Sequence, residues 1–273
     1  MSKENYVQKL ILNKKIYIFD EKDITNYQVI YNEINNKIVK AKWSSIDIVL
    51  KLFKNNDCFE KEIEILNELK GHPNIINFYG LLHHNMQYHL VQEYANNRNL
   101  NDYLQTHFKN LNWNDKINIA KDIANGVFYI HNKNIIHNDL HSKNILVNDN
   151  KMKISDFEFA RYENEIHIKK INNGMVAYIE PKAIEDWNYI CDKRSDIYAL
   201  GVIFWQISSG RKPFINHTTR EAIAISISLC KREIKIEGTP EKYKELYETM
   251  WNQKPDNRLE IKEIFDILKE FNI

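Results

Sequence analysis

The sequence is short of glycine and cysteine, and each shortage excludes a kind of site. Seven glycines occur in 273 residues, and the first of them is Gly71. Backbone turns that hold an anion at close range need positions without side chains, so such a turn is excluded from the stretch before Gly71. The three cysteines, Cys58, Cys191 and Cys230, show neither metal-ligand spacing nor an even count. This excludes a disulfide framework and favours a reducing compartment.

Charge of one sign and long apolar runs are lacking as well. Lysine and arginine number 38, aspartate and glutamate 37, and the net charge is +1. We therefore expect neither nucleic acid nor membrane as a partner. The N-terminal stretch alternates charged with apolar residues, unlike a signal peptide or a membrane span, and we expect a cytoplasmic protein. At 43% hydrophobic residues, the chain can form one large domain or two smaller ones.

Two regions of different periodicity follow one another along the chain. In the first, β-branched and aromatic residues between Asn-rich turns predict strands with one helix among them. The expected strands cover residues 16–19, 28–31, 37–43, 46–53, 75–82 and 88–94, and the helix covers 59–70. The second region predicts helices over 100–107, 113–131, 197–207, 220–231, 240–252 and 261–271. The helix at 197–207 is apolar almost all round, which indicates a central position, with Ser195 or Asp196 as its N-cap.

The stretch from His137 to Phe157 carries polar residues suited to phosphoryl transfer. This chemistry needs a base that orients a hydroxyl and oxygen ligands that hold Mg²⁺ against phosphates. Asp139 can serve as the base, and Asn144 and Asp156 offer an amide oxygen and a carboxylate for the metal. The apolar run after Asn144 and the polar turn that follows it predict a hairpin. That hairpin would bring Asn144 and Asp156 together.

Here the chain resembles the protein kinases, and most of all their tyrosine-kinase-like group. The family's catalytic-loop and metal-loop patterns match at His137, Asp139, Leu140, Asn144, Asp156 and Phe157, and the phrases 113–116, 139–144 and 237–240 look most like that group. The resemblance implies an α+β, two-lobed fold. The N-lobe, residues 1–94, would hold a small antiparallel sheet plus one helix, and the C-lobe, residues 95–273, would be mainly helical, with a hinge at about 93–97.

The resemblance also implies which residues serve ATP and Mg²⁺. Lys51 lies where the family presents its phosphate-binding lysine, and Glu62 on the following helix would hold Lys51 in position. Most serine/threonine kinases place a lysine two residues after the catalytic aspartate, where this chain has His141; Lys143 follows two residues later. The implied catalytic residues are Asp139, Lys51, Glu62 and Lys143, the implied metal ligands are Asn144 and Asp156, and the nucleotide would contact Lys51, Ile38, Val49, Glu93 and Leu146.

Several positions around the nucleotide depart from the family pattern. The three glycines of the family's phosphate loop fall at Tyr31, Glu33 and Asn36, and Val49 replaces a small alanine. We therefore expect weaker binding of ATP, and of the Mg²⁺ that accompanies it. Glu158 replaces the glycine that follows the Asp-Phe pair, and it would restrict the backbone there.

The segment between residues 158 and 181 also departs from the pattern. Asn138 replaces the arginine that usually precedes the catalytic aspartate, as in non-RD kinases, and the segment contains no serine or threonine. Tyr162 and Tyr178 are its only hydroxyls. The common regulation, in which a phosphorylated serine or threonine orders this segment through an arginine, is therefore not expected.

At the end of this segment, Lys182 replaces a family glutamate that pairs with an arginine matching Arg258. Two cations facing each other would loosen the packing there. Glu180, Glu185 or Asp186 would have to compensate.

Three functions remain open from the sequence. The first is a protein kinase of low efficiency that transfers the ATP γ-phosphate to a protein hydroxyl, with serine or threonine favoured over tyrosine. The second is a pseudokinase that acts as a signalling scaffold or allosteric binding module. The third is a small-molecule kinase, because those enzymes share the His-x-Asp spacing without arginine. The expected partners are nucleotide and a protein substrate or signalling protein.

Overall fold

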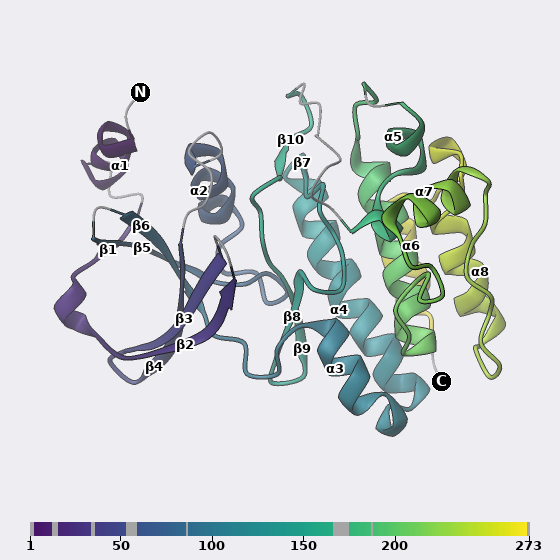
Figure 1. Cartoon of the computed structure of the whole chain (residues 1–273), viewed down its shortest axis with the longest axis horizontal. Helices are drawn as coiled ribbons and strands as arrows, with labels where there is room; N and C mark the ends of the chain where they lie inside the picture. The colour runs from purple at the N-terminus through teal and green to yellow at the C-terminus, as the bar shows by residue number, and fades with distance from the viewer. Residues whose placement is uncertain are drawn as a thin grey trace. The chain divides into compact units, whose positions relative to one another are not determined.

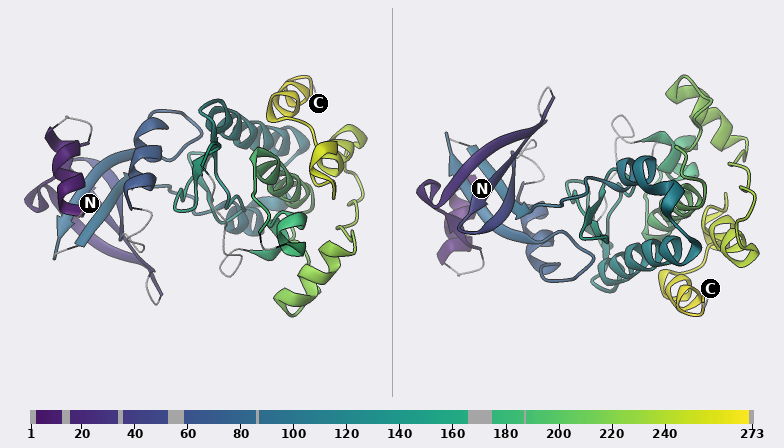
Figure 2. Two further views of the ribbon diagram at one scale, coloured as in Figure 1. Left: turned by 90° about the horizontal axis from the view of Figure 1, so that it is seen from above. Right: turned by 90° about the horizontal axis from the view of Figure 1, so that it is seen from below.

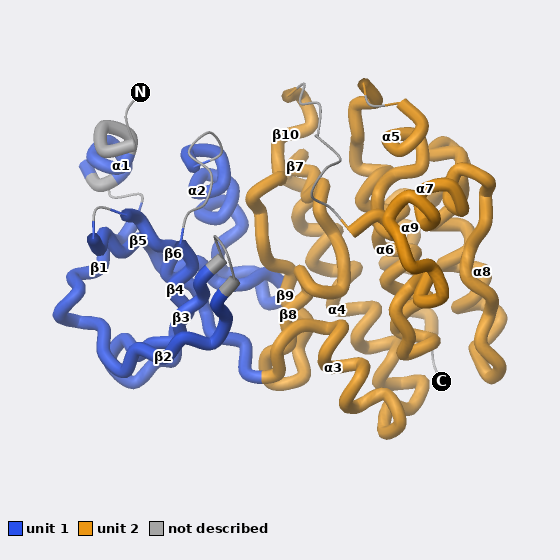
Figure 3. Tube along the Cα trace, in the orientation of Figure 1, with its two compact units in different colours: residues 1–96 blue, residues 97–273 orange. Residues whose placement is uncertain are grey.

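The computed structural model describes residues 3–12, 16–33, 36–52, 59–85, 87–165, 175–186 and 188–271. The chain divides into two compact units, residues 1–96 and 97–273 (Figure 3), and each is described by itself. Phe53, the predicted last residue of a strand, lies outside the described residues, as does the part of the 158–181 segment between residues 166 and 174.

Unit 1 is built on a six-stranded sheet with the order β1-β5-β6-β4-β3-β2 (Figure 1). All neighbours pair antiparallel except β1 and β5, which are parallel. The strands are β1 (Ile18–Phe19), β2 (Ile24–Glu33), β3 (Asn36–Trp43), β4 (Ile46–Leu52), β5 (Phe78–His84) and β6 (Gln87–Glu93); the helices are α1 (Lys3–Leu12), α2 (Phe59–Glu68) and the short η1 (Glu21–Asp23).

The two faces of β4 have different surroundings because successive side chains alternate across a sheet. Ile48 and Leu50 are buried in an apolar core together with Ala41, Val91 and Phe19. Val49 and Lys51 alternate with these two residues along the strand and therefore point to the other face.

The N-terminal segment joins the sheet at a position that requires glycine. Gly80 has a φ of +153°, and a Cβ added there would lie 2.1 Å from the carbonyl oxygen of Tyr17. The N–H of Leu81 donates to that same oxygen at 3.0 Å. A side chain at position 80 would therefore push β1 away from β5. The sequence predicted the strand at 16–19 but not helix α1.

Unit 2 is mainly helical (Figure 2). Its helices are α3 (Leu100–His107), α4 (Trp113–Asn132), α5 (Pro181–Glu185), α6 (Lys193–Ser209), α7 (Arg220–Ser228), α8 (Glu241–Met250) and α9 (Ile261–Lys269), with short turns η2 (Phe108–Asn110), η4 (Val176–Tyr178) and η5 (Pro255–Asn257); its strands are β7 (Ile135–Ile136), β8 (Ile145–Asn148), β9 (Lys151–Ile154) and β10 (Arg161–Tyr162). The α+β class predicted from the sequence is confirmed.

Helix α6 is the buried centre of unit 2. All its residues from Ser195 to Ser209 are buried, and it packs against α4 and α8. The predicted N-cap was wrong, because the cap is Asp192, whose side chain accepts a hydrogen bond from the N–H of Arg194 while Ser195 completes a capping box. The helix thus begins at Lys193, which leaves the carboxylate of Asp196 available for another element.

No helix within the described ranges is both long enough and apolar enough to cross a membrane.

Candidate functional site

Lys51 on β4 and Glu62 on α2 meet inside unit 1. The Nζ of Lys51 lies 4.0 Å from Oε1 of Glu62, and their side chains are 15% and 4% exposed. Helix α2 buries Phe59, Ile63 and Leu66 on the same side as Glu62, so packing of its apolar stripe carries the carboxylate inward. A carboxylate held in such surroundings needs a cation nearby. The contact expected between these two residues is therefore present, while their roles stay predictions.

Two predicted nucleotide residues share a sheet face with Lys51. Ile38 on β3 lies directly opposite Lys51 in the antiparallel register. Val49 lies two residues from Lys51 on the same strand, and both are partly buried. Glu93 differs, because its carboxylate accepts a hydrogen bond from the N–H of Asn77 at 3.2 Å, and its register partner is the core residue Ile48. Its side chain therefore lies on the opposite face.

In unit 2, Asp196 on α6 holds the loop that contains Asp139. Its two carboxylate oxygens accept hydrogen bonds from the N–H groups of His137 and Asn138, both at 2.9 Å, and His131 contacts it at 3.0 Å. Burial alone would raise the pKa of Asp196, but these hydrogen bonds and the nearby His131 and His137 outweigh it and lower the pKa. The loop is thus fixed to the most buried helix of the unit.

Asp139 and Asn144 lie in direct contact within this loop. The side-chain nitrogen of Asn144 donates to the backbone oxygen of Asp139 at 2.9 Å and to its Oδ2 at 3.2 Å. His141 approaches the same Oδ2 with its Nε2 at 3.6 Å. Because the nitrogen of the Asn144 amide faces Asp139, its oxygen points the other way. That orientation suits a metal ligand.

The predicted hairpin is present as β8 and β9. Ile145 pairs with Ile154, and both the N–H and the hydroxyl of Ser155 donate to the backbone oxygen of Asn144, at 2.9 and 3.0 Å. Asp156 follows directly. The described residues contain no group of three His, Cys, Asp or Glu side chains able to hold a metal ion. Asn144 and Asp156 offer an amide oxygen and a carboxylate, which are donors that suit a Mg²⁺ ion whose remaining oxygens come from phosphates and water. Their role as metal ligands stays a prediction.

The turn around Asp156 does not need a glycine at position 158, where the family pattern has one. Asp156 itself has the left-handed φ of +65°, whereas Glu158 is not among the described residues with positive φ. Aspartate tolerates the left-handed region better than most residues. Phe157 is fully buried, with its ring 4.9 Å from that of His137. The expectation that Glu158 would restrict this turn does not apply to the conformation observed.

Asn138 connects the loop to the start of the 158–181 segment. It has a left-handed φ of +62°, and its side-chain nitrogen donates to the backbone oxygen of Phe159 at 3.1 Å. This contact was not predicted. The only available signal was the tolerance of asparagine for positive φ, and that property does not name a partner.

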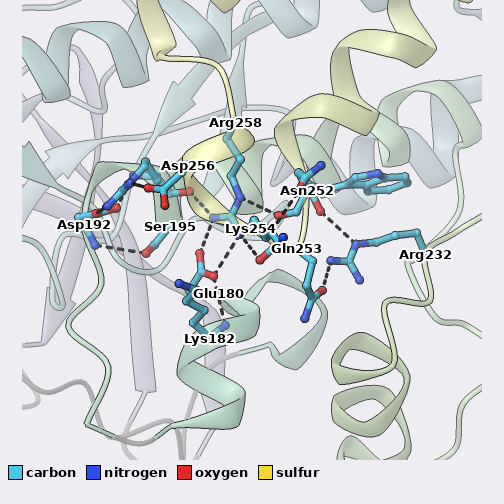
Figure 4. A network of polar contacts seen from close by, with 12 residues as sticks. Glu180, Lys182, Asp192, Ser195, Arg232, Asn252, Gln253, Lys254, Asp256 and Arg258 are labelled. Carbon is cyan, nitrogen blue, oxygen red and sulfur yellow. Dashed lines mark hydrogen bonds and ion pairs between the residues drawn. The ribbon is translucent and has the colours of Figure 1, made fainter.

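Glu180 is the residue that compensates for Lys182. It forms a buried, two-point ion pair with Arg258, in which Nη2 of Arg258 lies 3.1 Å from Oε1 and Nη1 bonds Oε2 (Figure 4). Arg258 also donates to the backbone oxygens of Arg194 and Asn252, each at 2.8 Å. Lys182 is exposed. Glu185, another of the predicted candidates, instead accepts a hydrogen bond from the side chain of Gln253.

The hydroxyl of Tyr178 is occupied inside unit 2. It donates to Oε1 of Gln206 at 2.7 Å and lies 3.2 Å from the hydroxyl of Ser142, and burial raises the pKa of Tyr178. The other predicted site residues of this unit are Lys143, which is exposed, and Leu146 on β8, which is partly buried and forms a bridge with Asn99.

The chain is similar to a known protein family and to several named proteins. A family model described as protein tyrosine and serine/threonine kinase matches residues 26–268. A probable LIM domain-containing serine/threonine-protein kinase of Dictyostelium discoideum is 29% identical over 96% of this chain and 42% of its own length. A putative serine/threonine-protein kinase/receptor of Acanthamoeba polyphaga mimivirus is 30% identical, over 86% of this chain and 14% of its own length.

A plant protein gives a similar match. Serine/threonine-protein kinase STY17 of Arabidopsis thaliana is 25% identical over 86% of this chain and 42% of its own length. The chain thus spans less than half the length of these curated relatives.

Proposed function

Because this chain belongs to the protein tyrosine and serine/threonine kinase family, we propose that it transfers the γ-phosphate of ATP to a serine or threonine hydroxyl of a protein. The family uses ATP and Mg²⁺ and acts on proteins. The choice of serine or threonine follows the names of the relatives, which are serine/threonine-protein kinases. We expect the transfer to be of low efficiency, because Tyr31, Glu33 and Asn36 occupy the positions of the phosphate-loop glycines.

One observation carries the proposal, namely the contact between Asn144 and Asp139. It turns the Asn144 oxygen away from the base, so that one amide serves both groups. Asn144 and Asp156 would hold Mg²⁺, which neutralises phosphate charge when bound. Asp139 would accept the proton of the attacking hydroxyl. Lys51, kept in position by Glu62, would bind the phosphates.

The experiment measures binding and transfer separately on the purified chain. Thermal unfolding is recorded with millimolar ATP, with and without Mg²⁺, and γ-phosphate incorporation is then followed into the chain itself and into a mixture of serine- and threonine-containing peptides. Asp139→Asn should keep the thermal shift and lose transfer, whereas Asp156→Ala should lose the part of the shift that depends on Mg²⁺.

Each alternative gives a different result. A thermal shift without transfer to any peptide would identify a nucleotide-binding pseudokinase. Consumption of ATP only when a metabolite is supplied would identify a small-molecule kinase. No shift at all would contradict the proposed function.

A further inference from the structure

His141 is a partly buried imidazole beside the predicted base. Its side chain is 12% exposed, that of Asp139 is 14% exposed, and Nε2 of His141 lies 3.6 Å from Oδ2 of Asp139. The ring of His141 lies 6.0 Å from that of Tyr178, centroid to centroid. These three residues line one pocket of unit 2 together with Met175 and Ile179. His141 is thus enclosed between the base and the segment that forms the other wall of the pocket.

The tautomer of His141 follows from these surroundings. A carboxylate only accepts hydrogen bonds, so the nitrogen that faces Asp139, Nε2, carries the proton. Nδ1 is then an acceptor, and it is buried without a hydrogen-bond partner among the described residues. Asn144 donates to the same oxygen of Asp139 at 3.2 Å. Two donors on one loop, Nε2 of His141 and the side-chain nitrogen of Asn144, therefore face the same oxygen, Oδ2 of Asp139.

From this geometry we propose that His141 is a positioning residue, whose Nε2–H fixes the orientation of the Asp139 carboxylate for the acceptor hydroxyl. The proposal rests on the protein-kinase function proposed above. At 3.6 Å the contact is longer than a hydrogen bond, and contacts of catalytic groups commonly shorten when substrate fills the site. A histidine at position 141 is short and rigid, so it reaches Asp139 and little beyond.

The step that depends on this orientation is the proton transfer. The acceptor oxygen forms a bond to the γ-phosphorus, the bond from that phosphorus to the bridging oxygen breaks, and its electron pair leaves with ADP. The hydroxyl proton passes to Asp139. A carboxylate turned away from the hydroxyl fails in this step only. Loss of His141 should therefore lower kcat and leave the KM for ATP unchanged.

Three variants separate positioning from packing. In His141→Gln the amide nitrogen reaches about as far as Nε2, in His141→Asn it reaches only as far as Nδ1, and His141→Leu fills similar space without a donor. We expect kcat within about threefold of the parent for the Gln variant, and about tenfold lower or more for the Asn and Leu variants. An equal loss in the Gln and Asn variants would overturn the proposal, and so would full activity of the Leu variant.

A second measurement does not need activity. Crystal structures of the variants should show the Asp139 side chain in its present rotamer with Gln at position 141 and in another rotamer with Leu; Asn replaces Leu in the comparison if the Leu variant does not fold. An unchanged rotamer in all variants would contradict positioning. If the parent chain transfers no phosphate, the protein-kinase function fails, and the rotamers alone decide the role of His141.

Discussion

At the scale of single residues, the backbone conformations around the site occur at residues that tolerate them. Asn138 and Asp156 have positive φ, while Glu158 does not. Asparagine and aspartate enter the left-handed region at a lower cost than other residues with a Cβ. A departure from a family motif therefore has to be judged by the backbone angle at that position in this chain.

Restoring the family glycine at position 158 should bring no gain. Glu158→Gly frees a residue whose φ is already acceptable, so it mainly increases the entropy of the unfolded chain. We expect a loss of about 0.5–1 kcal/mol in the free energy of unfolding and no increase in phosphate transfer. Urea unfolding and a transfer assay test both parts. A clear rise in transfer would mean that the turn must pass through an angle that only glycine allows.

Removing the carboxylate of Glu180 should lower the stability of the protein. The side chains of Arg258 and Glu180 are 0% and 1% exposed, so Glu180→Ala leaves a buried cation unpaired and should lower the free energy of unfolding by about 3 kcal/mol or more. The matched control is Lys182→Ala on α5, the short helix that Glu180 precedes. The side chain of Lys182 is exposed, and we expect little change. The double variant Glu180→Ala/Arg258→Met should recover part of the loss. Equal stability of the two single variants would show that the pair contributes nothing.

At the scale of elements, the edge strand β1 is held by its close approach to Gly80. The two residues Ile18 and Phe19 pair with Leu81 and Leu82, and Phe19 belongs to the core of unit 1. The strand is short, so a small displacement removes all of its pairing. The pairing of β1 with β5 should therefore be sensitive to any side chain added at Gly80.

Gly80→Ala should therefore destabilise unit 1 more than an ordinary glycine substitution does. Gly71 is the control, because it also has positive φ, +88°, while an added Cβ there meets nothing within 4 Å. We expect about 1 kcal/mol for Gly71→Ala from backbone strain alone. Gly80→Ala should cost about 2 kcal/mol beyond that because of the overlap with Tyr17. Hydrogen exchange of the Leu81 amide measures the loss of β1 directly, and an unchanged exchange rate would show that β1 can shift and keep its bond.

Local signals explain which elements the sequence predicted. The predicted helix at 100–107 coincides with α3, and the one at 113–131 ends one residue before α4 does, because apolar periodicity and capping residues are properties of the segment itself. The N-cap of α6 was predicted wrongly because composition alone could not show which of several possible capping residues is used. Ser195 and Asp196 have the right composition for a cap, but the carboxylate of Asp196 bonds a distant loop instead.

At the scale of the whole molecule, buried histidines make stability depend on pH. His137 is fully buried; its Nδ1 accepts from the N–H of Asp139 at 3.3 Å and its Nε2 donates to the backbone oxygen of Ser155 at 3.0 Å. Both nitrogens are satisfied in the neutral form, so a second proton would face an N–H group. Burial lowers the pKa of His137.

This predicts a loss of stability in mild acid. Since the folded pKa lies below the unfolded value of about 6.5, the unfolded chain binds more protons below that pH, and the free energy of unfolding should fall by about 1 kcal/mol between pH 7.5 and 5.5. His137→Asn should flatten this slope, and the exposed His107→Asn should not. Urea unfolding at the two pH values measures it; a residual slope is expected from His89, whose pKa burial also lowers. Parallel slopes for the parent and His137→Asn would contradict the prediction.

Contacts between distant segments mark the limit of what the sequence could predict. The α+β class and the hairpin after Asn144 followed from local patterns. Glu180 and Arg258 are 78 positions apart, and three nearby carboxylates were equally plausible partners for Arg258. Only the burial of the segment before α5 decides among them. The same holds for Asn138 and Phe159, which the chain brings together only when its loops are folded.

The position of Glu180 bears on how degenerate kinases are recognised in genomes. A survey that scores each alignment column would count Lys182 as a lost glutamate and treat the chain as one step closer to an inactive relative. Yet the ion pair that the glutamate stands for is formed from two positions upstream. Surveys of inactive kinases should ask whether a residue within a few positions can form the same contact, and not only whether one alignment position is unchanged. They would then distinguish sites that have lost a contact from sites that form it with another residue.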